Sequence, residues 1–188
     1  VVMSYNTCYD QLGGYEFGPM FPGSRIIDIH EYLLEKGITL PAAQQGAYLY
    51  HEPCHNPMKL GDSTKTVKAL IGNNVLKNNR CCGESGTLGV TRPDISTQVR
   101  FRKEEEIRRG AAQLRADGLA GEKQNVKILT SCPSCLQGLK RYEDDLPNGG
   151  LLEADYIVIE MARHILGENW LKDYVDRANA GGIERVLV

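Results

Sequence analysis

The 188-residue sequence lacks several features that would each indicate a class of function. Lysine and arginine number 22 against 24 acidic residues, so the net charge of −2 leaves no basic excess for nucleic acid or an anionic membrane surface. No apolar run reaches the roughly 20 residues that a membrane-spanning helix needs, and no signal-peptide pattern opens the sequence. We therefore expect a cytoplasmic protein that neither binds nucleic acid nor spans a membrane.

Cysteine is too scarce for a disulfide scaffold. The chain has six cysteines, whereas small secreted domains that depend on disulfides carry many more for their length. Without a secretion signal, the pattern favours metal or redox chemistry over paired disulfides.

The length and a hydrophobic content of 41% suit one domain with a core, or one domain plus a fragment. Residues 1–5 read as a strand already in progress, so we interpret the chain as a piece of a longer polypeptide.

Strand and helix patterns alternate along the chain. This alternation predicts an α/β fold with a mostly parallel sheet flanked by helices. Strands are predicted at residues 1–5, 25–29, 47–51, 126–130 and 156–159, with a further strand at 183–188. Helices are predicted at residues 30–36, 63–71, 95–115, 133–142, 160–166 and 170–178. Residues 73–80 are interpreted as a polar connection, and the many charges of residues 95–115 as a solvated helix face.

Two segments share one spacing, in which a leucine follows a cysteine by four residues and a tyrosine by seven. These segments are Cys8-Leu12-Tyr15 and Cys135-Leu139-Tyr142. Tyr5 stands where the second segment has Cys132. The match predicts an internal duplication. Residues 1–40 would then be the tail of a first copy, residues 41–166 a full second copy, and residues 167–188 a C-terminal extension.

Five of the six cysteines form one pattern: a lone Cys54, the adjacent pair Cys81-Cys82 followed by glycine, and Cys132-x-x-Cys135. Adjacent cysteines are a poor disulfide pair because their Cβ atoms do not easily reach the required geometry. They can, however, direct two sulfurs at one metal centre. Cys54 and Cys132 both follow predicted strands, which places them at the carboxyl edge of the sheet, where open α/β folds have their sites.

Thiolates are soft ligands, which suit zinc, copper(I) and iron–sulfur clusters. The start of a helix favours a thiolate at Cys132-x-x-Cys135. A structural zinc site usually takes four ligands as two Cys-x-x-Cys pairs, and only one such pair is present. A thioredoxin-like pair would not explain Cys81 and Cys82. The pattern favours iron–sulfur, with zinc, thiol redox chemistry and a disulfide as alternatives. Cys8 has no local partner and is interpreted as a buried or free thiol.

The residues around the cysteines admit two interpretations each. Gly83 could let the backbone approach a cluster and donate N–H groups to sulfur, or could serve a plain turn. His51 and His55 flank Cys54; each could be a ligand or a donor behind the ligands, but a structural histidine is the more frequent case.

These residues resemble the cysteine-rich CCG domain family. The resemblance covers roughly residues 47–166 and rests on Tyr50-His51-Glu52-Pro53-Cys54-His55, Cys81-Cys82-Gly83 and Cys132-Pro133-Ser134-Cys135. The family includes the B subunit of heterodisulfide reductase and iron–sulfur subunits or modules of glycolate oxidase, D-lactate oxidation proteins and anaerobic glycerol-3-phosphate dehydrogenase. In this chain the first spacer is shorter and the second longer than the usual pattern, which affects the expected loop geometry rather than the ligand set.

The resemblance implies a ligand set, a cofactor and partners. Its five ligands would be Cys54, Cys81, Cys82, Cys132 and Cys135. They would hold a [4Fe–4S] cluster, of a non-cubane type in the heterodisulfide reductase subunit, whereas some relatives hold zinc. The chain also resembles the C-terminal part of large bacterial FAD-linked oxidases. It carries no flavin motif, so FAD would lie elsewhere in the parent protein.

The function expected from this resemblance is an iron–sulfur electron-transfer module of a FAD-linked 2-hydroxyacid-type dehydrogenase. Its partners would be a flavin-containing dehydrogenase domain or subunit and an acceptor such as a quinone or another carrier, through which the module would associate with a membrane. The module alone would not oxidise substrate. The alternative is a structural zinc-binding module without a redox role.

Overall fold

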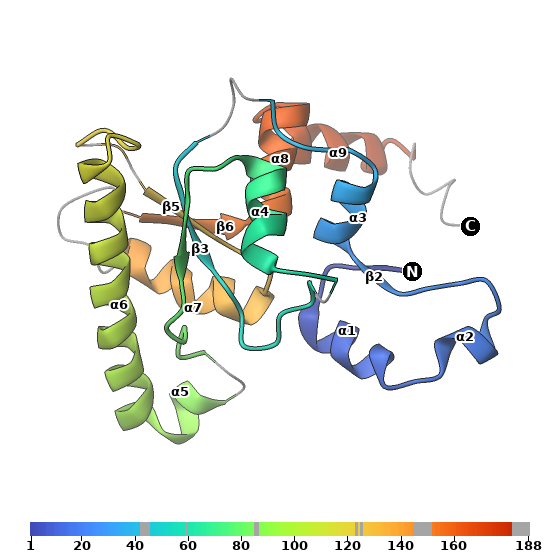
Figure 1. Ribbon diagram of the computed structural model, residues 1–188, viewed down its shortest axis with the longest axis horizontal. Helices are drawn as coiled ribbons and strands as arrows, with labels where there is room; N and C mark the ends of the chain where they lie inside the picture. The colour runs from blue at the N-terminus through green and yellow to red at the C-terminus, as the bar shows by residue number, and fades with distance from the viewer. Residues whose placement is uncertain are drawn as a thin grey trace.

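The computed structural model describes residues 1–41, 46–58, 60–84, 87–122, 124, 126–144 and 152–181. Its centre is a parallel four-stranded sheet in the order β4-β3-β5-β6 (Figure 1). The strands are β3 (Tyr48–His51), β4 (Val75–Asn78), β5 (Val126–Thr130) and β6 (Leu152–Tyr156). The α/β fold with a parallel sheet flanked by helices, predicted from the sequence, is confirmed.

Helices cover both faces of this sheet (Figure 1). On one face, α6 (Pro93–Ala116) and α7 (Pro133–Asp144) enclose a core that includes Leu49 and Ile128. On the other face, α4 (Ser63–Ile71) and α8 (Ile157–Leu166) enclose a core that includes Tyr48 and Tyr50. The alternation along β3 follows the two-residue period of a strand, in which successive side chains point to opposite faces.

The N-terminal segment forms a smaller unit beside α4. Strands β1 (Val2–Met3) and β2 (Ile27–Asp28) pair in parallel, and the helices are α1 (Asn6–Gly13), α2 (Phe17–Met20) and α3 (Ile29–Glu35). Helix α3 packs against α4. If α2 is left aside, β1, α1, β2 and α3 follow the order strand, helix, parallel strand, helix. The elements β5, α7, β6 and α8 follow the same order. The internal duplication and the domain boundaries at 40 and 166 remain predictions.

Two predictions about the strands are wrong. Of the residues 156–159 predicted as a strand, only Tyr156 belongs to one, as the last residue of β6, and Ile157 begins α8. The β-branched run favours a strand locally, but Ile157, Glu160 and Met161 are buried at helical spacing, and packing against the sheet decides the outcome. The predicted polar connection at residues 73–80 contains β4, an outer strand whose buried positions include the polar Asn78.

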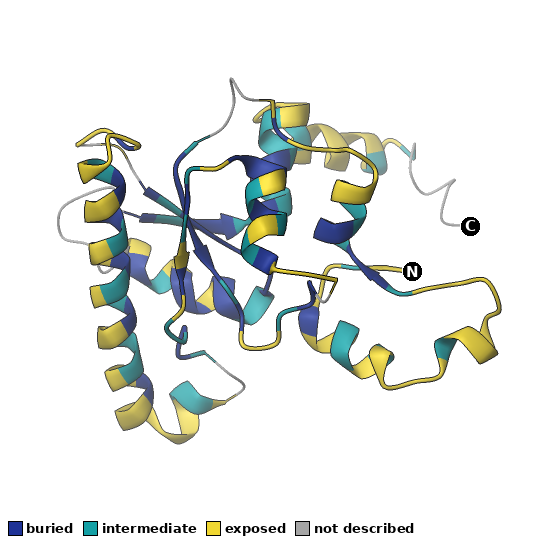
Figure 2. Cartoon of the chain, viewed as in Figure 1, coloured by how far each residue is buried: buried dark blue, intermediate teal, exposed yellow. Residues whose placement is uncertain are grey.

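The longest helix, α6, shows a buried stripe toward the sheet and an exposed outer face (Figure 2). Its predicted limits, 95–115, agree with the structure within two residues.

Two further helices complete the described chain, α5 (Leu88–Thr91) before α6 and α9 (Trp170–Asn179) after α8. The expected strand at 183–188 lies outside the described residues. Within the described residues, no helix is both long and apolar enough to cross a membrane.

Candidate metal centre

Three adjacent parallel strands carry the predicted cysteines to one edge of the sheet. Cys54 follows β3, the pair Cys81-Cys82 follows β4, and Cys132 and Cys135 follow β5. Because parallel strands point the same way, their carboxyl ends meet at one edge. All five cysteines line a single cavity of about 170 Å³, together with Asn6, Thr7, His55 and Ser134. The arrangement expected from the sequence is therefore the one observed, while the role of each sulfur as a ligand remains a prediction.

The three inner sulfurs form a compact buried cluster. Cys82, Cys132 and Cys135 are each at most 6% exposed. The Sγ atoms of Cys82 and Cys135 lie 3.4 Å apart, and the backbone N–H of Cys135 donates to Cys132 Sγ at 3.4 Å. Cys54 is exposed and Cys81 is half-buried. The site thus has a buried inner part and an outer rim that opens to solvent.

Contacts among the thiols shift their pKa values in opposite directions. The contact with Cys135 lowers the pKa of Cys132 to about 6, and the contact with Cys135 also lowers the pKa of Cys82. The pKa of Cys135 is raised by the same two contacts, and that of Cys81 by its contact with Cys82. These contacts favour the thiolate form of Cys82 and Cys132, which is the form in which cysteine binds a soft metal.

Backbone geometry brings N–H groups and a close helix to the sulfurs. Gly83 has φ of +77°, a region that favours glycine, and its N–H donates to Cys81 Sγ at 3.3 Å. Gly83 therefore fits both interpretations made from the sequence: it forms a turn, and its N–H donates to a sulfur. At Gly138 in α7, an added Cβ would lie 2.9 Å from the Glu84 Cβ and 3.2 Å from the Cys82 carbonyl oxygen. The sequence analysis did not identify Gly138, which lets α7 approach the Cys81-Cys82 loop.

The Cys54 loop is held by a carboxylate. Glu52 accepts hydrogen bonds from Asn56 Nδ2, at 2.9 Å, and from the Ser63 hydroxyl, and it forms an ion pair with Lys77. Burial alone would raise the pKa of Glu52, but these contacts lower it overall. Glu52 thereby ties the exposed Cys54 to α4 and to β4.

The N-terminal segment closes one side of the cavity. The Asn6 side chain is buried and hydrogen-bonds to Cys132, which helps to lower the pKa of that thiol after the larger effect of Cys135. Asp10 Oδ2 lies 3.0 Å from Nδ1 of His55. Cys8 is free and exposed, and it does not line the cavity. The spacing that suggests the repeat gives no signal for the role of Asn6.

A polar network lies behind the inner sulfurs. A ring nitrogen of His51 and the sulfurs of Cys82 and Cys135 lie within 4.8 Å of one another. The Nζ of Lys103 lies 2.9 Å from His51 Nδ1 and 3.2 Å from Glu106 Oε2, and it donates to Asn78 Oδ1. Burial lowers the pKa of Lys103, whereas Glu106 and the two thiols oppose that shift. His51 thus belongs to the site itself.

Lys103 is the main correction to the sequence analysis. The prediction that all the charges of α6 form a solvated face is wrong at this residue, which is completely buried. Lys103 lies four residues before Ile107 and eight before Ala111, both of which are buried. It therefore occupies the apolar stripe of α6, and that position was the available signal.

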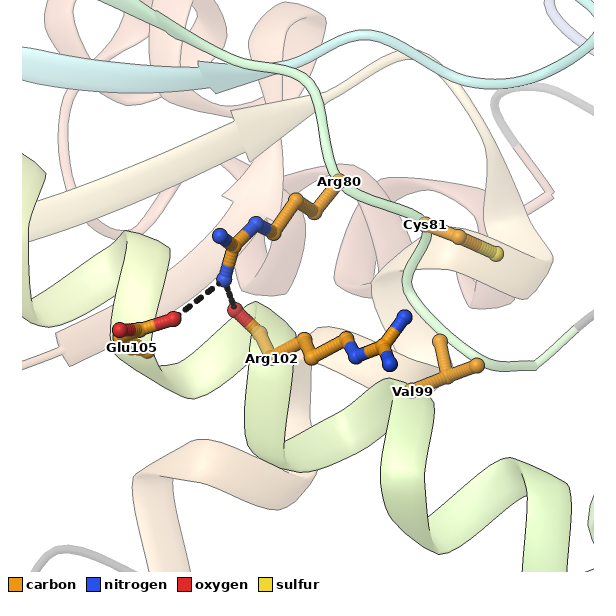
Figure 3. A pocket seen from close by; sticks show the side chains of 5 residues that line it. All are labelled: Arg80, Cys81, Val99, Arg102 and Glu105. Atoms are coloured by element: carbon orange, nitrogen blue, oxygen red, sulfur yellow. Dashed lines mark hydrogen bonds and ion pairs between the residues drawn. The ribbon is translucent and has the colours of Figure 1, made fainter.

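A second cavity, of about 460 Å³, opens beside Cys81 (Figure 3). Its other lining residues are Arg80, Val99, Arg102 and Glu105. Arg80 Nη1 donates to the Arg102 carbonyl oxygen and to Glu105 Oε2, both at 2.6 Å. Figure 3 shows the Arg102 guanidinium extending toward Val99. Cys81 thus borders both cavities and connects the sulfur cluster with the surface.

Comparison with known families agrees with this geometry. Residues 48–140 match the model of the cysteine-rich domain, CCG, and this range contains all five clustered cysteines. Residues 48–140 form a CCG cysteine-rich domain. Residues 140–188 match a domain of unknown function, DUF3400, and no curated protein matches the chain. In the cysteine-rich domain the donor set fits a metal cofactor, since thiolates and a nearby imidazole suit soft metals.

Proposed function

We propose that the cysteine-rich domain is an iron–sulfur electron-transfer module of a FAD-linked 2-hydroxyacid-type dehydrogenase. The observation that carries this proposal is the convergence of five thiols from three loops on one cavity, with backbone N–H groups at hydrogen-bond distance from two sulfurs. Cys54, Cys81, Cys82, Cys132 and Cys135 would hold a [4Fe–4S] cluster, which supplies one-electron chemistry when bound.

The residues around the sulfurs support an electron-transfer role. The N–H groups of Gly83 and Cys135 stabilise negative charge on sulfur. The buried position of Cys82, Cys132 and Cys135 excludes water from the inner part of the site. Cys54 and Cys81 reach the surface, where a flavin domain and an acceptor such as a quinone could approach. We place this module in the cytoplasm, in a longer protein or complex that binds the flavin.

A structural zinc site is the second candidate, and one observation favours it. The Sγ atoms of Cys82 and Cys135 are only 3.4 Å apart. Two sulfurs bound to one tetrahedral zinc at about 2.3 Å each would lie about 3.8 Å apart, so this pair could bind one ion with little movement. The zinc candidate does not use all five thiols, because a structural zinc takes four ligands.

The test is the metal and acid-labile sulfide content of the chain purified without oxygen, with absorption spectra before and after dithionite. Iron and sulfide near four per chain, with a visible band that bleaches on reduction, are expected. Cys82→Ser should lose most of the iron, whereas Cys8→Ser is the matched control, since Cys8 lies outside the cavity. Stoichiometric zinc with neither sulfide nor colour would overturn the proposal.

A further inference from the structure

The buried ammonium of Lys103 is surrounded by acceptors. Four atoms accept from it: His51 Nδ1 at 2.9 Å, Glu106 Oε2 at 3.2 Å, Asn78 Oδ1, and the Asn78 carbonyl oxygen at 3.5 Å. An ammonium has only donors, so these contacts are made when Lys103 carries its proton. Because Lys103 is completely buried, its charge is poorly screened by solvent.

This contact determines the tautomer of His51. A donor at Nδ1 requires that Nδ1 accept, so the ring proton of neutral His51 lies on Nε2. Nε2 is buried and has no hydrogen-bond partner among the described residues. With Nδ1 occupied by Lys103, Nε2 is the ring nitrogen that remains for the sulfurs of Cys82 and Cys135, which lie within 4.8 Å of the ring.

The buried positive charge also has an electrical consequence. An uncompensated ammonium inside a protein is costly, and Glu106 offers one negative charge at the outer end of the network. The sulfurs of Cys82 and Cys135 also act electrostatically on Lys103 and favour its protonated form. A centre held by these sulfurs becomes more negative when it gains an electron, and a nearby fixed cation stabilises that state.

We propose that Lys103 and His51 are positioning residues of the metal centre. Lys103 holds His51 in the tautomer that presents Nε2–H to the metal-binding sulfurs, and its charge raises the reduction potential of the centre. This inference rests on the proposed iron–sulfur function. In the redox step one electron enters from the reductant and no proton leaves Lys103 or His51.

The tautomer is tested first, on the metal-free reduced chain, by nitrogen NMR with 15N-labelled histidine. The chain has four histidines, and the signals that disappear in His51→Gln assign residue 51. In the wild-type chain, His51 should be protonated at Nε2 and unprotonated at Nδ1. A wild-type spectrum with the proton on Nδ1 would overturn the assignment, and this measurement requires no cluster.

The charge is tested by redox titration of cluster-loaded chains at constant pH, followed by electron paramagnetic resonance. Lys103→Gln keeps an N–H donor without the charge, and Lys103→Met removes both. Each should disfavour reduction about tenfold, a shift of about 59 mV to lower potential for one electron. Only Lys103→Met should also change the His51 tautomer. Arg109→Met, which removes an exposed charge from the same helix, should leave the potential unchanged.

The outcomes separate this inference from the proposed function. Wild type without iron and sulfide would refute the proposed function, while the NMR result would still decide the tautomer. Variants with wild-type iron and sulfide but an unchanged potential would refute the role of the Lys103 charge. If Lys103 were only structural, its variants would change the thermal unfolding of the chain without changing the potential of the retained cluster.

Discussion

The sulfurs of Cys82 and Cys135 lie 3.4 Å apart although 53 residues separate them in the sequence. The pKa of Cys82 is lowered by its contact with Cys135, so Cys82 supplies a thiolate beside a thiol. We expect diamide to oxidise the metal-free chain to a Cys82–Cys135 disulfide, with the reagent accepting two electrons and two protons. Mass spectrometry of unreduced peptides detects the link. Metal loading should prevent it, and a Cys132–Cys135 disulfide as the main product would contradict the prediction.

Gly138→Ala should weaken metal binding. The new Cβ would lie 2.9 Å from the Glu84 Cβ and 3.2 Å from the Cys82 carbonyl oxygen, so α7 must move away from the Cys81-Cys82 loop. Overpacking of this kind costs about 1–3 kcal/mol. Urea unfolding of the metal-free chain and a competition titration with a chelator measure the two effects. Gly18→Ala is the control, because nothing lies within 4 Å of its added Cβ, and equal behaviour of the two variants would count against the close contact.

Asn6→Ala should make the metal centre more sensitive to oxygen. The change removes a hydrogen bond to Cys132 and part of the cavity wall. We expect the visible absorption of the loaded chain to decay several-fold faster in air than that of wild type. Gln11→Ala, an exposed change in the same helix, should decay at the wild-type rate. Equal decay of wild type and Asn6→Ala would show that the N-terminal segment does not protect the site.

Glu160→Gln should destabilise the domain at neutral pH but not in acid. This buried carboxylate accepts hydrogen bonds from Tyr48 at 3.0 Å and from Lys127 at 2.9 Å. Burial would raise the pKa of Glu160, but these contacts, with that of His164, lower it overall. Stability from a depressed carboxyl pKa is present above the unfolded-state pKa and is lost as the pH falls through the folded-state value.

The loss in Glu160→Gln at pH 7 should be about 3–5 kcal/mol, because a buried charge network loses its anion. The variant and wild type should converge only as the pH falls below the lowered folded-state pKa of Glu160, where the carboxyl is protonated in both folded and unfolded chains. Urea unfolding at a series of acidic pH values measures the difference. A difference that stays constant throughout this acid range would exclude the carboxylate charge as its source.

The sequence predicts the fold and the location of the site because both depend on local signals. Strand β5 is predicted at its observed residues, and α7 begins at Pro133, directly after Cys132, as expected. Cys54 and Cys132 follow parallel strands, so topology alone places them at one edge. The strand that carries Cys81-Cys82 to the same edge was not predicted, because residues 73–80 have the composition of a polar connection.

The remaining features depend on contacts that local patterns do not contain. Nothing in residues 156–159 indicates that Ile157 packs as the first residue of a helix. The N-terminal Asn6 is 126 positions from Cys132, and only the folded chain brings them together. Lys103 is an intermediate case, because its position on the apolar stripe of α6 indicates burial, but its hydrogen bond with His51 depends on tertiary structure.

The strand order has a consequence for how metal enters and leaves. Among the described strands, β4 pairs only with β3, whereas β5 lies between β3 and β6. Outer elements of a fold open locally at lower free energy than central ones. Fraying of β4 would therefore withdraw Cys81 and Cys82 together while Cys132 and Cys135 keep their places. Metal exchange in this domain would then proceed through a half-open state, at a rate governed by one strand rather than by unfolding of the whole chain.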